Sequence, residues 1–78
     1  MNETIEQRIK KIFAEQLGVA INEVTADDTV ETLHGDSLDH VEIIMAVEDD
    51  LSVEIPDEKM EELETVQQIV DYVTKVKA

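Results

Sequence analysis

The apolar positions of the chain recur at helical spacing in at least three segments. The first apolar stripe lies near the N-terminus and comprises Ile5, Ile9, Ile12 and Phe13. Gly18, directly after Leu17, is a natural helix end because glycine adopts the left-handed backbone that often closes helices. No segment alternates apolar and polar residues over several positions, as a half-buried strand would. The pattern therefore predicts an all-α chain.

A long irregular stretch rich in Asp and Thr follows, roughly over residues 19–35. From it we expect apolar side chains to pack under the helices at Val24, Val30 and Leu33. Asp36 is a favourable N-cap, and Asp39, three residues later, occupies the acidic position of a capping box. These signals predict a second helix that starts at residue 36 and runs to about residue 51.

The C-terminal third of the chain predicts two further helices. Pro56 suits the first turn of a short helix that reaches about residue 62. Thr65 and Gln68 form a capping-box pair that opens the last helix. The apolar stripe of this last helix comprises Val66, Ile69, Val70, Val73 and Val76. The predicted fold is a four-helix bundle with three longer helices, one short helix and a long loop between helices 1 and 2.

The predicted second helix has two apolar faces, whereas an ordinary bundle helix has one. With about 100° per residue, a short stripe forms on one side from Leu38, Val41 and Met45. A longer stripe on the far side comprises Ile43, Ile44, Val47 and Leu51. We expect the longer stripe to face the core and the shorter one to be partly exposed. The alternative is that the start of the short stripe packs under the preceding loop.

Acidic residues flank the short stripe. Asp39, Glu42 and Asp49 fall on one side of it, and Glu48 falls on the other. An apolar patch with a carboxylate rim suits transient docking, because the rim attracts a basic partner and the patch supplies modest affinity.

Length and composition narrow the class of protein. The 78 residues leave room for one core, so we expect a single domain over residues 1–78 that serves as a carrier, binder or regulator. The chain has no cysteine, so it has no disulfide and no thiolate metal site. The sequence shows neither a signal peptide nor an apolar run of membrane-spanning length, and we expect a cytoplasmic monomer without membrane insertion.

The net charge of −14 is concentrated in the middle of the chain. No basic residue occurs between Lys11 and Lys59, a window that holds fourteen acids. Such a surface repels nucleic acid and anionic lipid and attracts proteins with basic patches. Solubility alone could also explain an acidic surface, but the segregation favours a partner surface.

Ser37 would lie in the first turn of the second helix, beside backbone N–H groups that lack helical partners. A phosphate attached there would meet these donors and the positive end of the helix dipole. Serine is also common at helix starts as a cap, although Asp36 can already cap this helix. The chemistry alone leaves both roles open.

The run from Leu33 to Glu42, LHGDSLDHVE, resembles the phosphopantetheine attachment motif of acyl carrier proteins, whose core is Asp-Ser-Leu. The likeness to bacterial fatty-acid carriers extends along nearly the whole chain, through residues 5–12, 15–19, 23–25, 41–48, 54–58 and 65–67. The resemblance implies that the Ser37 hydroxyl attacks the pyrophosphate of coenzyme A, catalysed by a separate phosphopantetheinyl transferase with Mg²⁺. The attached 4'-phosphopantetheine arm would then carry acyl chains as thioesters between fatty-acid-synthesis enzymes, and the chain would have no catalytic residue of its own.

The resemblance also assigns roles to other positions. Asp36 is the motif acid. The positions that meet the transferase and the acyl-processing enzymes, which have basic docking patches, correspond to Leu38, Asp39, Val41, Glu42, Met45, Glu48 and Ile55. We add Asp49 to this partner surface because the helical spacing places it beside the short stripe. The expected lining of an acyl-chain cavity comprises Ile43, Ile44, Val47, Ile55 and Ile69.

Three features depart from the family pattern. His34 stands where a glycine is usual, and the glycine is shifted to Gly35, next to the motif acid. The preceding loop is one residue short and lacks a common aromatic, and His40 replaces a small polar residue. The histidines lack zinc-ligand spacing, so we interpret them as incidental surface residues. A second hypothesis is that either of them, when protonated, pairs with the phosphate of the arm.

Other functions are compatible with parts of the pattern. Within the carrier class, the alternative is a polyketide, peptide or other specialised pathway. In a different class, an acidic helical protein could mimic DNA, although that leaves the second apolar face and Ser37 unexplained. A specific calcium site is disfavoured because Asp27-Asp28 and Asp49-Asp50 lack the ligand alternation and central glycine of an EF-hand loop.

Overall fold

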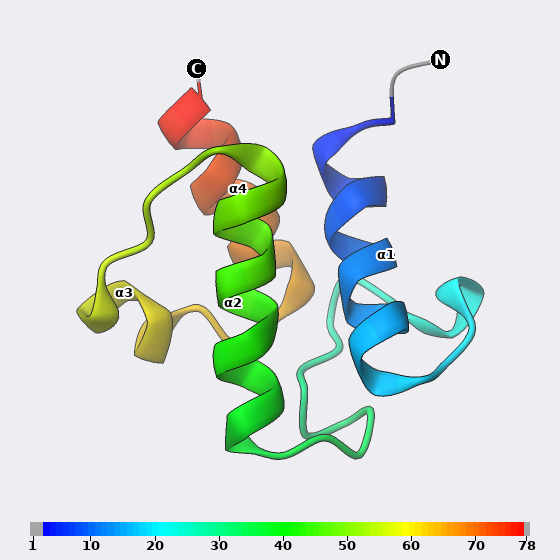
Figure 1. The fold of residues 1–78 in the computed structure, drawn as a ribbon. Coiled ribbons are helices and arrows are strands. Elements are labelled where there is room, and N and C mark those ends of the chain that lie inside the picture. The colour runs from blue at the N-terminus through cyan, green and yellow to red at the C-terminus, as the bar shows by residue number, and fades with distance from the viewer. Residues whose placement is uncertain (1–2, 78) are drawn as a thin grey trace.

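The computed structural model describes residues 3–77, which form an all-helical fold (Figure 1). Its elements in order are α1 (Ile5–Leu17), the 3₁₀ turn η1 (Ile21–Glu23), α2 (Ser37–Leu51), α3 (Asp57–Glu62) and α4 (Val66–Lys77). The predicted all-α class, with three longer helices, one short helix and a long connection between the first two, is confirmed. The η1 turn within this connection was not predicted.

The helix ends follow local capping chemistry. Gly18 closes α1 in the left-handed conformation, with φ 69°. Asp36 and Asp39 form the predicted reciprocal capping box at the start of α2. Gln68 donates its N–H to the Thr65 hydroxyl and accepts the Thr65 N–H, which confirms the capping pair before α4. Helix α3 begins at Asp57, so Pro56 lies directly before the first turn and not within it as predicted.

The core lies where α1 packs against both α2 and α4 (Figure 1). The predicted inner stripe of α2 is fully buried, as are Val24 and Val30 from the long connection, and Leu33 is half-buried. Burial of such branched side chains is the main favourable contribution to folding. The last residue of the predicted α4 stripe, Val76, is 48% exposed, because it lies in the final turn beyond the core.

None of the helices described between residues 3 and 77 has the length and apolar character needed to cross a lipid bilayer.

Candidate functional site

Ser37 is the first residue of α2, and its side chain is exposed. The capping role belongs to its neighbours: Asp36 accepts the Asp39 N–H at 3.0 Å, and Asp39 accepts the Asp36 N–H at 3.0 Å. The Ser37 hydroxyl makes no hydrogen bond with any residue between 3 and 77. Because the helix begins here, the N–H groups of Ser37 and Leu38 have no preceding helical carbonyl to pair with. The site therefore presents an unused hydroxyl beside free backbone donors.

The carboxyl group of Asp39 is held at both oxygens. One oxygen accepts the Asp36 N–H, and the other accepts the side-chain amide of Gln16 at 3.3 Å. The Asp36 N–H bond and then the Gln16 bond lower the pKa of Asp39 below its ordinary value, because both stabilise the charged form. Asp39 is consequently a fixed negative charge next to the first turn of α2.

The backbone of the two residues before Asp36 has a conformation and packing that favour glycine. His34 has φ 70°, in the left-handed region where a side chain is strained. A Cβ atom on Gly35 would lie 2.6 Å from Leu17 Cδ2 and from Val30 Cγ1. Gly35 is thus required by close packing, whereas His34 occupies a backbone conformation that suits glycine. The sequence shows that the glycine is shifted from position 34 to position 35, but it does not show the positive φ of His34 or the close contacts of Gly35.

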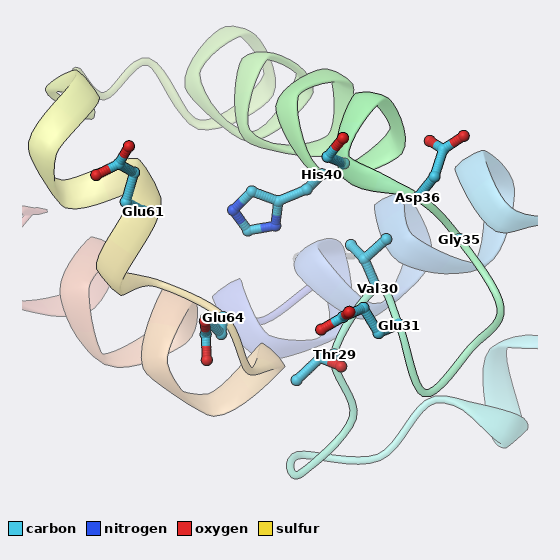
Figure 2. Close-up of a pocket in the computed structure, with 9 residues that line it drawn as sticks. Thr29, Val30, Glu31, Gly35, Asp36, His40, Glu61 and Glu64 are labelled. Atoms are coloured by element: carbon cyan, nitrogen blue, oxygen red, sulfur yellow. The ribbon is translucent and has the colours of Figure 1, made fainter.

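A groove of about 640 Å³ borders Ser37, a size typical of small-molecule sites. Its walls come from the long connection, the start of α2 and the α3–α4 region, and its lining comprises Thr29, Val30, Glu31, Gly35, Asp36, Ser37, His40, Glu61 and Glu64. Figure 2 shows the His40 imidazole projecting from α2 between the segment with Thr29 and Val30 and the segment with Glu61 and Glu64. The polar lining is dominated by carboxylates.

His40 links α2 to α3, which corrects its interpretation as an incidental surface residue. Its Nε2 atom lies 2.9 Å from the carbonyl oxygen of Met60, and its side chain is half-buried. None of the six residues of α3 is fully buried, and the short helix is held both by this hydrogen bond and by the Met60 side chain, which packs against the core. His34 is exposed, and the pairing of either histidine with the phosphate of the arm stays a prediction.

The short apolar stripe of α2 lies on the surface. Leu38 is 64% exposed, Met45 is 59% exposed, and Val41 is 37% exposed, so they are not packed under the loop. Beside this stripe, Glu42 and Asp49 are exposed, and Asp39 and Glu48 are half-buried. We call these three apolar and four acidic residues the α2 surface patch.

The residues expected to line an acyl cavity are all in the core. Ile43, Ile44, Val47, Ile55 and Ile69 are at most 5% exposed, and none of them lines the groove beside Ser37. Ile55 was expected both in the cavity and on the partner surface. Its side chain is 5% exposed, and its N–H donates to Glu48 at 2.8 Å, so it lies behind the patch rather than on it.

The model of the phosphopantetheine attachment site family matches residues 7–73. The chain belongs to this family. Members of the phosphopantetheine attachment family carry a covalent 4'-phosphopantetheine group, so the chain is a phosphopantetheine-carrying carrier protein.

The start of α2 fits such a group. An exposed serine hydroxyl can form a phosphodiester without breaking an existing hydrogen bond, and the free N–H groups of the first turn suit a phosphate. The groove alongside offers room for a flexible arm. Between residues 3 and 77, no three His, Asp or Glu side chains are grouped to hold a metal ion.

Proposed function

We propose that Ser37 is the attachment point of 4'-phosphopantetheine and that the chain carries acyl groups for fatty-acid-synthesis enzymes. In the loading step, the Ser37 Oγ forms a bond to the phosphorus of the pantetheine half of coenzyme A. The pyrophosphate P–O bond breaks, adenosine 3',5'-bisphosphate leaves, and a base on the transferase takes the hydroxyl proton. The attached arm supplies a thiol for thioester formation, which the cysteine-free chain lacks.

The residues of the chain present Ser37 rather than perform chemistry. Asp36 and Asp39 close the helix end through their own hydrogen bonds, so the hydroxyl is not needed as a cap. Gly35 allows the loop to pack closely against Leu17, and this contact fixes the direction in which the chain enters α2. The chain is therefore a substrate and shuttle for other enzymes in this proposal.

The α2 surface patch is the proposed docking site for the transferase and the fatty-acid-synthesis enzymes. Its apolar centre of Leu38, Val41 and Met45 supplies short-range affinity, and its carboxylates attract basic partner surfaces. We assign Glu48 a second task, because it also holds the Ile55 N–H. Sheltering of an acyl chain between helices would require the packed core isoleucines to separate, since their side chains are buried.

The observation that carries the proposal is the exposed Ser37 hydroxyl without a hydrogen bond at the capped start of α2, within the residues that the family model matches. The protein should be incubated with coenzyme A, Mg²⁺ and a broad-specificity phosphopantetheinyl transferase and then weighed intact. We expect a mass gain of one phosphopantetheine that is absent in Ser37→Ala. No gain in the unaltered protein would contradict the proposal and favour an acidic interaction protein.

The fatty-acid role needs a separate test. The loaded protein should accept a malonyl group from a fatty-acid-synthesis acyltransferase and support chain extension by the partner condensing enzyme. Efficient loading with phosphopantetheine but no malonyl transfer would indicate a carrier of another pathway.

A further inference from the structure

The negatively charged rim beside Ser37 is held in place by a residue of another helix. Gln16, in the last turn of α1, directs its side-chain Nε2 to the Asp39 Oδ1 at 3.3 Å and also donates to the Glu42 Oε1. Gln16 is half-buried, and its hydrogen bonds to Asp39 and Glu42 join α1 to α2. One neutral side chain thus contacts two carboxylates that lie 23 and 26 residues further along the chain.

The two carboxylates depend on Gln16 to different extents. Asp39 is also held by the Asp36 N–H at its second oxygen. Glu42 is exposed, and the Gln16 amide is its one side-chain hydrogen bond among residues 3–77. Without Gln16, the Glu42 side chain would sample several rotamers, and binding a partner would have to order it.

The choice of an amide at position 16 is compatible with a docking surface. A lysine there would also pair with the two acids, but it would cancel part of the negative charge that attracts a basic partner. A glutamate would bring a third carboxylate to the same place and repel the other two. Glutamine orients both acids and leaves their full charge available.

Resting on the proposed function, we infer that Gln16 is a positioning residue that holds Asp39 and Glu42 in the orientation in which the transferase docks beside Ser37. Gln16 acts through these carboxylates and makes α1 part of the docking apparatus. It takes no part in the bond changes at Ser37.

The kinetic test compares Gln16→Met with Gln67→Met. Methionine keeps the length and apolar body of glutamine but removes the N–H donors. Gln67 is a matched control because its amide donates to the Asp71 carboxylate at 2.7 Å on the exposed side of α4. We expect Gln16→Met to raise the KM of the transferase for the apo-protein by about 2- to 10-fold, with kcat unchanged. Gln67→Met should change KM by less than about twofold, and equal KM values for all three proteins would overturn the inference.

Two further measurements separate positioning from other roles. In a Glu42→Gln background, Gln16→Met should raise KM by less than it does alone, whereas additive effects would indicate that Gln16 touches the partner itself and would overturn the inference. Carboxyl NMR titration should show a higher pKa for Asp39 in Gln16→Met than in the unaltered protein, because a donor to its charged form is lost. An unchanged pKa would show that the amide does not hold Asp39.

The titration also distinguishes the two proposals. If the unaltered protein gains no phosphopantetheine, the proposed function fails, but the titration still reports whether Gln16 holds the acid. If loading proceeds and neither the KM nor the Asp39 pKa changes in Gln16→Met, the inference fails while the proposed function stands.

Discussion

The two faces of α2 differ in what surrounds the same kinds of side chain. Ile44 is 1% exposed and its sequence neighbour Met45 is 59% exposed, although both are large and apolar. The inner face contributes to the core with α1 and α4, and its residues are enclosed on all sides. Within residues 3–77 no element covers the outer face, which is bordered by acids. One helix can therefore stabilise the fold with one face and reserve the other for partners.

Several acids of α2 are held in place by other residues, whereas acids that only keep a protein soluble need no such contacts. Asp39 and Glu42 are bonded to Gln16, Glu48 is bonded to the Ile55 N–H, and Asp50 pairs with Arg8 at 2.9 Å. Exposed pairs of this kind add little stability. Their effect is to orient the carboxylates, as the proposed docking of partner enzymes would require.

The largest expected effect comes from truncating the inner face. Ile44→Ala should lower the free energy of unfolding by about 2–5 kcal/mol, because it leaves a cavity in a packed core. Urea unfolding measures this loss. The transferase KM, corrected for the folded fraction, should be unchanged, and a large change in KM for folded molecules would break the separation of the two faces.

The matching change on the outer face should have the opposite profile. Met45→Gln keeps the side-chain length but removes apolar area, so it should raise the transferase KM by about 3- to 10-fold. Its effect on the free energy of unfolding should stay within about 0.5 kcal/mol, because the side chain is exposed. A loss of stability comparable to that of Ile44→Ala would show that both faces belong to the core.

Local chemistry explains what the sequence could predict. Capping residues act within three or four positions, so Gly18, the Asp36–Asp39 pair and the Thr65–Gln68 pair marked helix ends correctly. The two faces of α2 also followed from helical periodicity. These signals need no knowledge of distant residues.

Contacts between distant residues could not be predicted in this way. The His40 bond to Met60 spans 20 positions, and Gln16 reaches Asp39 across 23. The resemblance assigns Ile55 both to the acyl-chain cavity and to the partner surface, because a motif position does not show which way a side chain faces. The positive φ of His34 depends on how the long connection turns into α2, and the residue type gave no direct sign of it.

A smaller effect is expected at the position where the chain approaches α2. His34→Gly should raise the free energy of unfolding by about 0.5 kcal/mol, because relief of left-handed strain exceeds the added entropy of the unfolded glycine. Gly18→Ala makes the opposite change, from glycine to a residue with a side chain, at nearly the same φ and with open space around the new Cβ. It should lower the free energy of unfolding by about 1 kcal/mol. Thermal melts measure both, and destabilisation by His34→Gly would show that the imidazole makes a favourable contact that outweighs the strain.

The smallest expected effect is the change in the free energy of unfolding when two acids of α2, Asp39 and Asp50, are protonated. The Asp36 N–H and Gln16 lower the pKa of Asp39, and the Arg8 guanidinium lowers the pKa of Asp50. A lowered pKa in the folded state contributes stability above the ordinary Asp value of about 3.9, and this contribution is lost as the pH falls through the lowered pKa.

Asp39→Asn tests this sign directly. The substitution should destabilise the fold at about pH 6, and this effect should shrink as the pH falls through the lowered pKa of Asp39, because the native carboxyl then becomes protonated as well. Unfolding curves measured at a series of pH values from about 6 downward give the comparison. An equal effect at every pH would mean that the charge of Asp39 contributes nothing and that its hydrogen-bond geometry alone matters.

Whether Ser37 is the attachment point is tested most directly by finding which serine carries the added group. The chain has two serines, Ser37 and Ser52, one at each end of α2. Trypsin releases both in one acidic peptide, because no basic residue lies between Lys11 and Lys59, so the loaded peptide must be fragmented in the mass spectrometer. We expect phosphopantetheine on Ser37, full loading of Ser52→Ala and no loading of Ser37→Ala. Loading that persists in Ser37→Ala, or a group that maps to Ser52, would show that Ser37 is not the attachment point.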